Sequence, residues 1–324
     1  MTRDEAPSGR TRSVAFDFPE VEIGIAEYEE GPTGCTVLHF PRGAACATDV
    51  RGGAPGVVGG YGRADAVCFA GGSLYGLEAV HGVAGELLAR RGSAKWGQIA
   101  VVCGAIIYDF GPRETIVYPD KALGRRALTA ATSGVCPVGR RGAGRLATVG
   151  KLHQIPHVRP EPGGQGAAFR TVGAAGVRIL VVTVVNAVGV VVDRAGRVVR
   201  GCYDEAVGGR RHPRDLLDPD HAGGVGAGAA GAGAGQPSGN TTLTAVVTSK
   251  RMSSYALNQM ARQVHASMAR AIQPFHTVRD GDVLFALSTE TDPEEAMDDF
   301  AVAEIASDLA WDAVLNAVGA DRPE

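Results

Sequence analysis

Two stretches near the middle of the 324-residue chain, 177–185 and 188–192, consist almost wholly of apolar and mostly β-branched residues. Residues of this kind favour strands, and a strand without a polar face is typical of a sheet that is covered on both sides. Helices that cover two stacked sheets would satisfy both faces of such strands. We therefore expect an α+β chain with a layered core.

The other elements expected from the sequence alternate between strands and helices without a fixed repeat. Ser253 is a suitable N-cap for one helix, and Asp292 followed by Pro293 resembles the start of the last one. Strands and turns are expected over 21–51, and buried apolar runs span 67–70 and 100–110. Further expected strands span 142–152, 177–185, 188–192, 241–248 and 283–287, and the expected helices span 74–90, 120–132, 253–272 and 293–318.

Composition restricts the function classes. The formal net charge is only −3, which gives no electrostatic reason to expect nucleic acid or a membrane surface as a partner. The six cysteines are widely spaced, and neither they nor the eight histidines show metal-ligand spacing, so we expect no metal or cofactor. Residues 1–15 read as a disordered polar arm without a signal-peptide core. These features favour a cytoplasmic protein with reduced, buried thiols.

Residues 221–239 form a tract dominated by Gly and Ala, including the run 222–235, and it ends abruptly at a β-rich segment that begins with Thr241. The tract has neither a helical nor a strand period, so we expect a flexible segment. On composition alone it fits an ordinary linker. It also fits a processing loop that precedes a nucleophile.

The processing hypothesis has a chemical basis. In an uncut chain the Thr241 hydroxyl could attack the carbonyl of Asn240, giving an ester that water then hydrolyses. The freed α-amine of Thr241 would have an ordinary pKa of about 7.7 to 8.0. Near neutrality such an amine is partly unprotonated, and it can act as the base for the hydroxyl of its own residue.

The junction Ser238-Gly239-Asn240-Thr241-Thr242-Leu243-Thr244 resembles that of peptidase family S58, the D-aminopeptidase and β-aminopeptidase group. The similarity is greatest to the branch of 6-aminohexanoate-oligomer (nylon-oligomer) endohydrolases, and it extends over roughly 16–318. Further matching motifs are Phe16-Asp17-Phe18-Pro19, Tyr75-Gly76-Leu77-Glu78-Ala79, Ile107-Tyr108-Asp109-Phe110, Tyr118-Pro119-Asp120-Lys121, Ile272-Gln273-Pro274-Phe275-His276 and Asp280-Gly281-Asp282.

The resemblance implies a set of site residues. It makes Thr241 the nucleophile and Lys151 a catalytic lysine that favours an alkoxide-like oxygen. Asn186 would be an oxyanion donor. The resemblance adds Tyr108 as an aromatic hydroxyl at the site, and it adds Asp280 and Asp282 as acids that hold Lys151 and the Thr241 amine. Without it, turn chemistry alone would explain Asn186 and Asp280-Gly281.

The resemblance also implies a four-layer αββα sandwich of the N-terminal-nucleophile type. A single catalytic domain, 16–324, would be cut into fragments 1–240 and 241–324 that stay associated, and four such heterodimers would form an oligomer. The expected activity is endo-type hydrolysis of 6-aminohexanoate oligomers or related linear amides. One alternative is an aminopeptidase for β-amino or D-amino acid N-termini, and another is a non-catalytic binding protein on the same fold.

Overall fold

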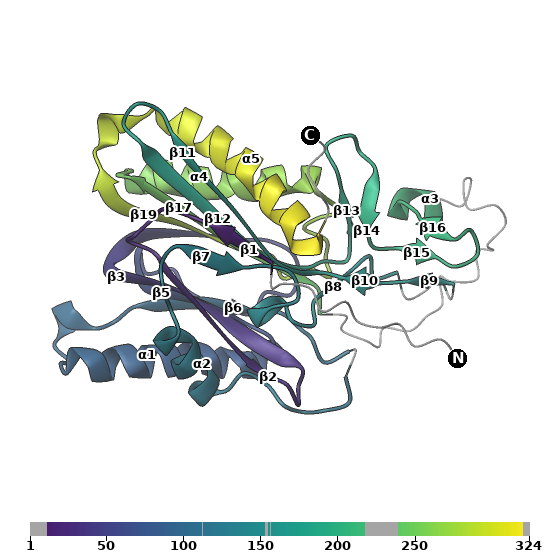
Figure 1. Ribbon diagram of the computed structural model, residues 1–324, viewed down its shortest axis with the longest axis horizontal. Helices are drawn as coiled ribbons and strands as arrows, with labels where there is room; N and C mark the ends of the chain where they lie inside the picture. The colour runs from purple at the N-terminus through teal and green to yellow at the C-terminus, as the bar shows by residue number, and fades with distance from the viewer. Residues whose placement is uncertain (1–11, 112, 153–154, 156, 218–238, 320–324) are drawn as a thin grey trace.

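The computed structural model describes residues 12–111, 113–152, 155, 157–217 and 239–319. Within these ranges nine strands form one strongly bent sheet (Figure 1). Its strands in spatial order are β11 (Gly164–Val172), β12 (Val177–Asn186), β17 (Thr241–Lys250), β19 (Val283–Asp292), β3 (Thr33–Val50), β5 (Arg63–Ala70), β6 (Val102–Ile106) and β4 (Val57–Val58), with β2 (Glu22–Tyr28) paired to β3.

Helices cover the two outer faces of this sheet. The covering helices are α1 (Leu77–Arg91), α2 (Lys121–Thr129), α4 (Ser254–Ser267) and α5 (Asp299–Val318), whereas the short helix α3 (Pro213–Leu217) lies beside β15 and β16. Figure 1 shows α4 and α5 on one side, against β11, β12, β17 and β19. It shows α1 and α2 on the opposite side, against β2, β3, β5 and β6. This arrangement is the αββα sandwich expected from the sequence.

The long strand β3 joins the two sheet layers. It pairs with β19 through 45–50 and with β5 mainly through 35–39, and its register shifts between His39 and Ala44. Strand β12 shows how both faces are covered. Ile179 and Val181 face the helices α4 and α5, whereas Leu180 and Val182 face the second sheet layer. The apolar run is therefore needed because neither face of this strand reaches water.

Smaller strand pairs lie beside the sandwich. They are β1 (Ser13–Ala15) with β7 (Val135–Pro137), β8 (Thr148–Val149) with β10 (Glu161–Pro162), β9 (Val158–Arg159) with β15 (Tyr203–Asp204) and β16 (Gly209–Arg210), and β13 (Val190–Val192) with β14 (Val198–Arg200) and β18 (Ile272–Gln273). Because 13–15 pairs with 135–137, the arm expected over 1–15 is ordered at its C-terminal end. Residues 1–11 and 218–238 lie outside the described residues, and with them the Gly/Ala tract.

Several boundaries and one helix face differ from the sequence expectation. The segment 142–152 is a 3-10 turn (Gly142–Gly144) followed by the short strand β8, not one alternating strand. The last helix is capped by Asp298 rather than Asp292, because β19 continues to Asp292. The helix expected from residue 74 begins at Leu77, after a 3-10 turn. The apolar spacing over 74–90 predicts one broad face made of Leu77, Val80, His81, Val83, Leu87 and Leu88. In the structure His81 and Leu88 are instead exposed.

The thiols agree with the expectation of buried, reduced cysteines. All six cysteines are buried and free. None of the helices in the described ranges combines the length and the apolar character needed to cross a membrane.

Candidate active site

Strand direction brings the candidate residues to one edge of the sheet. Strands β17 and β19 run parallel, so both begin at the same edge, and β12 runs antiparallel to β17, so it ends there. Asn186, the last residue of β12, pairs with Thr241, the first residue of β17. Asn240 likewise forms an isolated bridge with Asp280, just before β19. This geometry collects polar groups from segments far apart in the chain.

The bond between Asn240 and Thr241 lies in a defined set of contacts in the uncut chain. The Thr241 hydroxyl donates a hydrogen bond to the carbonyl oxygen of Asn240 at 2.6 Å. The backbone N–H of Gly281 donates to the same oxygen at 2.7 Å. A carbonyl with two donors is polarised, and the hydroxyl is beside it. Thr241 is also buried, so little water competes for these contacts.

Lys151 is buried beside Asn186. Its Nζ donates to the Asn186 side-chain oxygen at 2.8 Å and to the Asn186 backbone oxygen at 3.0 Å. The lysine forms no ion pair with any described carboxylate. Burial disfavours the charged amine and lowers the pKa of Lys151 to about 7, although the negative charge of Asp280 opposes this effect. A substantial fraction of this side chain is therefore neutral near pH 7.

The amide of Asn186 is fully used in the uncut chain. Its oxygen accepts from Lys151 and from the backbone N–H of Thr148 at 3.0 Å. Its nitrogen donates to the carbonyl oxygens of Gly239 and Tyr108, at 3.1 and 3.2 Å. One of its donors is therefore bound to the residue that precedes Asn240.

The two aspartates hold the backbone around the junction. Asp280 accepts from the N–H of Thr277 at 2.8 Å. Asp282 accepts from the N–H of Thr242 at 2.6 Å and from the His276 ring at 2.9 Å. Burial raises the pKa of Asp282, while the hydrogen bond from His276 lowers it in part. The resemblance implied aspartates that hold Lys151 directly, whereas the negative charge of Asp280 acts on this lysine by raising its pKa.

Tyr108 reaches the site in an unexpected way. Its backbone carbonyl, not its hydroxyl, contacts Asn186. Its side chain packs so closely on Gly239 that a Cβ added there would lie 2.0 Å from the Tyr108 Cβ. The resemblance implied a Tyr108 hydroxyl that donates to the oxyanion or to the substrate carbonyl, whereas in this structure the Tyr108 ring packs on Gly239 beside the junction.

Three groups with direct contacts were missed from the sequence, namely the backbone N–H groups of Gly281 and Thr148 and the ring of His276. A backbone N–H leaves no side-chain signal in a sequence. Gly281 has a structural reason to be glycine, since a Cβ there would lie 2.4 Å from the Ala54 carbonyl oxygen and 2.9 Å from the Thr241 hydroxyl oxygen. Within the described ranges no group of three or more His, Cys, Asp or Glu side chains is placed to hold a metal ion.

The fold is that of the Ntn hydrolases. The chain is similar to the solved L-aminopeptidase D-Ala-esterase/amidase of Ochrobactrum anthropi, described as a variant of the Ntn hydrolase fold. The match has a TM-score of 0.67 and 18% identity, over 92% of this chain and 83% of that one. At this identity the likeness concerns the fold alone.

The sequence comparisons define the family. The family model of peptidase family S58 matches residues 15–321, and the chain belongs to that family. It is 51% identical to a 6-aminohexanoate-oligomer endohydrolase of Agromyces sp. (strain KY5R), over 93% of this chain and 85% of the relative. An enzyme with the same name from Paenarthrobacter ureafaciens matches with the same identity and coverage. The chain is accordingly an amide hydrolase.

Proposed function

We propose that the chain cuts its own bond between Asn240 and Thr241. The observation that carries this proposal is the pair of donors, Thr241 hydroxyl and Gly281 N–H, on the Asn240 carbonyl oxygen. The hydroxyl oxygen adds to this carbonyl carbon, the C–N bond to Thr241 breaks, and the hydroxyl proton ends on the new α-amine. Water then hydrolyses the ester, which leaves the Asn240 carboxylate and restores the Thr241 hydroxyl.

Two groups assist that step. The neutral fraction of Lys151, whose pKa is about 7, is the candidate base for the hydroxyl proton, which it would accept directly or through a water molecule and then pass to the new α-amine. The Gly281 N–H is the candidate donor to the oxyanion that forms on Asn240. One such donor contributes a rate factor of about 10² to 10³ in comparable sites.

After the cut, Thr241 becomes the nucleophile for external amides. Its free amine accepts the hydroxyl proton as the oxygen attacks, and then passes the proton to the leaving amine. Departure of residues 239–240 frees the Gly281 N–H and one N–H of Asn186 to hold the substrate oxyanion. Because two relatives at 51% identity are 6-aminohexanoate-oligomer endohydrolases, we assign endo-type hydrolysis of such oligomers or related linear amides.

The two fragments, 1–240 and 241–324, remain together in this proposal. Strand β17, which begins at the cut, is hydrogen-bonded between β12 of the large fragment and β19 of its own fragment, and all ten of its residues are buried. Separation would expose this strand to water. We also propose that the protein is cytoplasmic and that four heterodimers form an oligomer. Sedimentation of the cut protein would test the size of this oligomer.

The deciding experiment is the intact mass of purified wild type and of Thr241→Ala under denaturing conditions. We expect two masses, with a break between residues 240 and 241, for the wild type and one full-length mass for the variant. Thr242→Val is the matched control, because the Thr242 hydroxyl has no hydrogen-bond partner within the described residues and its N–H is kept. A Thr241→Ala chain that breaks at the same bond would contradict self-cleavage by this residue.

The aminopeptidase alternative requires a different substrate preference. Hydrolysis of an N-acetylated oligoamide is compared with that of a free-amine β-dipeptide. An endo-acting enzyme cleaves the capped oligomer, whereas an aminopeptidase cleaves only the free amine. An uncut wild-type chain that cleaves neither substrate would point to the non-catalytic alternative.

A further inference from the structure

The uncut chain shows along which residues an acyl group bound to Thr241 extends away from the nucleophile. The ester formed during self-cleavage is an acyl-enzyme whose acyl group is the segment ending in Asn240. A substrate ester on the same Thr241 oxygen must begin at the same point. In the uncut chain this acyl segment passes from Asn240 to Gly239, which lies against the side chain of Tyr108 and the amide of Asn186.

A row of aromatic rings starts at that contact. The ring of Tyr108 lies 5.8 Å from that of Phe110, which lies 6.4 Å from that of Tyr75, and Tyr75 lies 5.7 Å from Tyr118. Tyr75 is 67% exposed, so its ring faces solvent rather than the core. Aromatic rings offer large apolar surfaces that bind aliphatic chains without needing a hydrogen-bond partner at each carbon.

The segment that carries Phe110 and Tyr118 is held firmly. Arg113 donates to the Asp109 carboxylate at 2.9 Å and to the Asp109 backbone oxygen at 3.1 Å. It also donates to the backbone oxygens of Thr115 and Val117, and its guanidinium lies 4.2 Å from the centre of the Phe110 ring. This buried arginine therefore ties the Phe110 ring to the backbone at 115–117 that leads to Tyr118.

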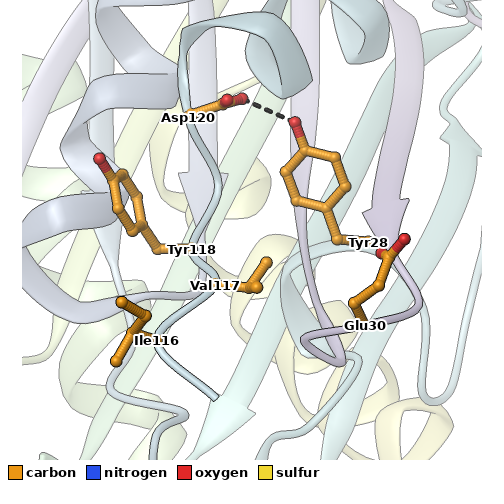
Figure 2. A pocket seen from close by; sticks show the side chains of 6 residues that line it. All are labelled: Tyr28, Glu30, Ile116, Val117, Tyr118 and Asp120. Atoms are coloured by element: carbon orange, nitrogen blue, oxygen red, sulfur yellow. Dashed lines mark hydrogen bonds between the residues drawn. The ribbon is translucent and has the colours of Figure 1, made fainter.

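The row ends at a hollow of about 390 Å³. Figure 2 shows its lining, in which the Tyr28 hydroxyl is directed at Asp120 and donates to it at 2.9 Å. The lining residues are Tyr28, Glu30, Ile116, Val117, Tyr118 and Asp120. The walls are partly apolar, and the two carboxylates disfavour an anionic group.

We propose that this row, Tyr108-Phe110-Tyr75-Tyr118, binds the aliphatic units on the acyl side of an oligoamide substrate, with the substrate's amino end toward the hollow of Figure 2. The proposal rests on the function proposed above. An extended chain covers about 3.5 Å for every three main-chain bonds, so a 6-aminohexanoyl unit reaches about 8 Å. The first unit therefore lies along Tyr108 and Phe110, and the second reaches Tyr75. The acyl side of such an oligomer ends in an amine, which suits the two carboxylates.

The test uses 4-nitroanilides of one and of three 6-aminohexanoyl units. Both release the same leaving group, so they differ only on the acyl side. We expect wild type to cleave the three-unit substrate with the higher kcat/KM. Tyr75→Ala and Tyr118→Ala should each lower kcat/KM for this substrate about five- to tenfold and leave the one-unit substrate unchanged. Tyr75→Phe, which keeps the ring, should behave as wild type.

Tyr255→Ala is the matched control, because Tyr255 is an exposed tyrosine on α4, on the opposite side of the sandwich. If Tyr75→Ala were as active as wild type on the three-unit substrate, the proposal that the row binds the acyl side of the substrate would be overturned. A wild-type enzyme that cuts itself but cleaves neither anilide nor any oligomer would instead overturn the proposed function.

For the amino end, Glu30→Gln should reduce the preference for a free over an acetylated three-unit substrate about threefold. A preference unchanged in Glu30→Gln would overturn the assigned direction.

Discussion

A buried lysine lies at each end of strand β17. Comparing their partners distinguishes a lysine suited to catalysis from one that stabilises the fold. At the far end, Lys250 is 1% exposed and forms an ion pair with Asp299, the first residue of α5. At the near end, Asn186 pairs with Thr241, and within the described residues the Nζ of Lys151 donates its hydrogen bonds to the side-chain and backbone oxygens of Asn186. Around Lys151 neutral oxygens take the place of a carboxylate, and burial lowers the pKa of this amine to about 7.

The hydrogen bonds around each lysine follow the same division. Near Lys250, the hydroxyls of Ser249 and Ser288 bond to Asp292 and to the Lys250 backbone oxygen, so this end joins β17, β19 and α5. Near Lys151, the bonds converge on the peptide that precedes Thr241. A buried lysine is therefore informative about catalysis only when its partners are known.

The largest expected difference is in self-cleavage. Lys151→Met removes the candidate base while keeping an unbranched side chain of similar size, and we expect the rate of the cut to fall at least about 100-fold. Lys250→Met should be cut at the wild-type rate. Denaturing gels of freshly purified protein over time measure both rates. Equal rates in the two variants would remove the functional distinction between the lysines.

The pH dependence of the cut gives a smaller effect with a defined sign. Burial lowers the pKa of Lys151 to about 7, and the unprotonated amine is the active form, so the rate should rise with pH. Between pH 6 and pH 8 we expect a rise of about tenfold, followed by a plateau. The α-amine of Thr241 does not exist before the cut, so it cannot contribute to this profile. A rate independent of pH over this range would exclude Lys151 as the base.

The smallest effect concerns stability and reverses the roles of the two lysines. Lys250→Met loses its ion pair with Asp299, which is 41% exposed, and we expect the free energy of unfolding to fall by about 1 to 2 kcal/mol. In Lys151→Met at pH 7 we expect little change or a gain, because a buried amine costs desolvation energy. Urea unfolding of the uncut chains in a Thr241→Ala background compares them directly.

How far the sequence predicts this molecule depends on the range of the interaction. The apolar strand β12 and the cap Ser253 were predicted correctly, because periodicity and capping are local. The cap at Asp292 was wrong, because this residue pairs with Lys250 at the end of β17, a contact 42 positions away. The exposed faces of His81 and Leu88 likewise depend on what α1 packs against.

The candidate site depends even more on contacts between residues that are far apart in the sequence. Lys151 and Asn186 are 35 positions apart, and Thr242 and Asp282 are 40 apart, and no local pattern links them. Only the family resemblance named Lys151, Asn186 and Asp282 together as site residues, and it did not name Thr242. The donors on the scissile carbonyl and the close packing of Tyr108 on Gly239 became visible through three-dimensional contacts.

The Gly281 N–H has a consequence for the order of events during synthesis. It lies 40 positions downstream of Thr241, so a growing chain that has just emerged past residue 241 still lacks this donor, as well as Asp282 and β19. The proposed cut must therefore wait until the chain as far as β19 has been made and folded. Chains truncated before residue 281 should persist as single polypeptides, so the fold itself sets the time at which the precursor matures.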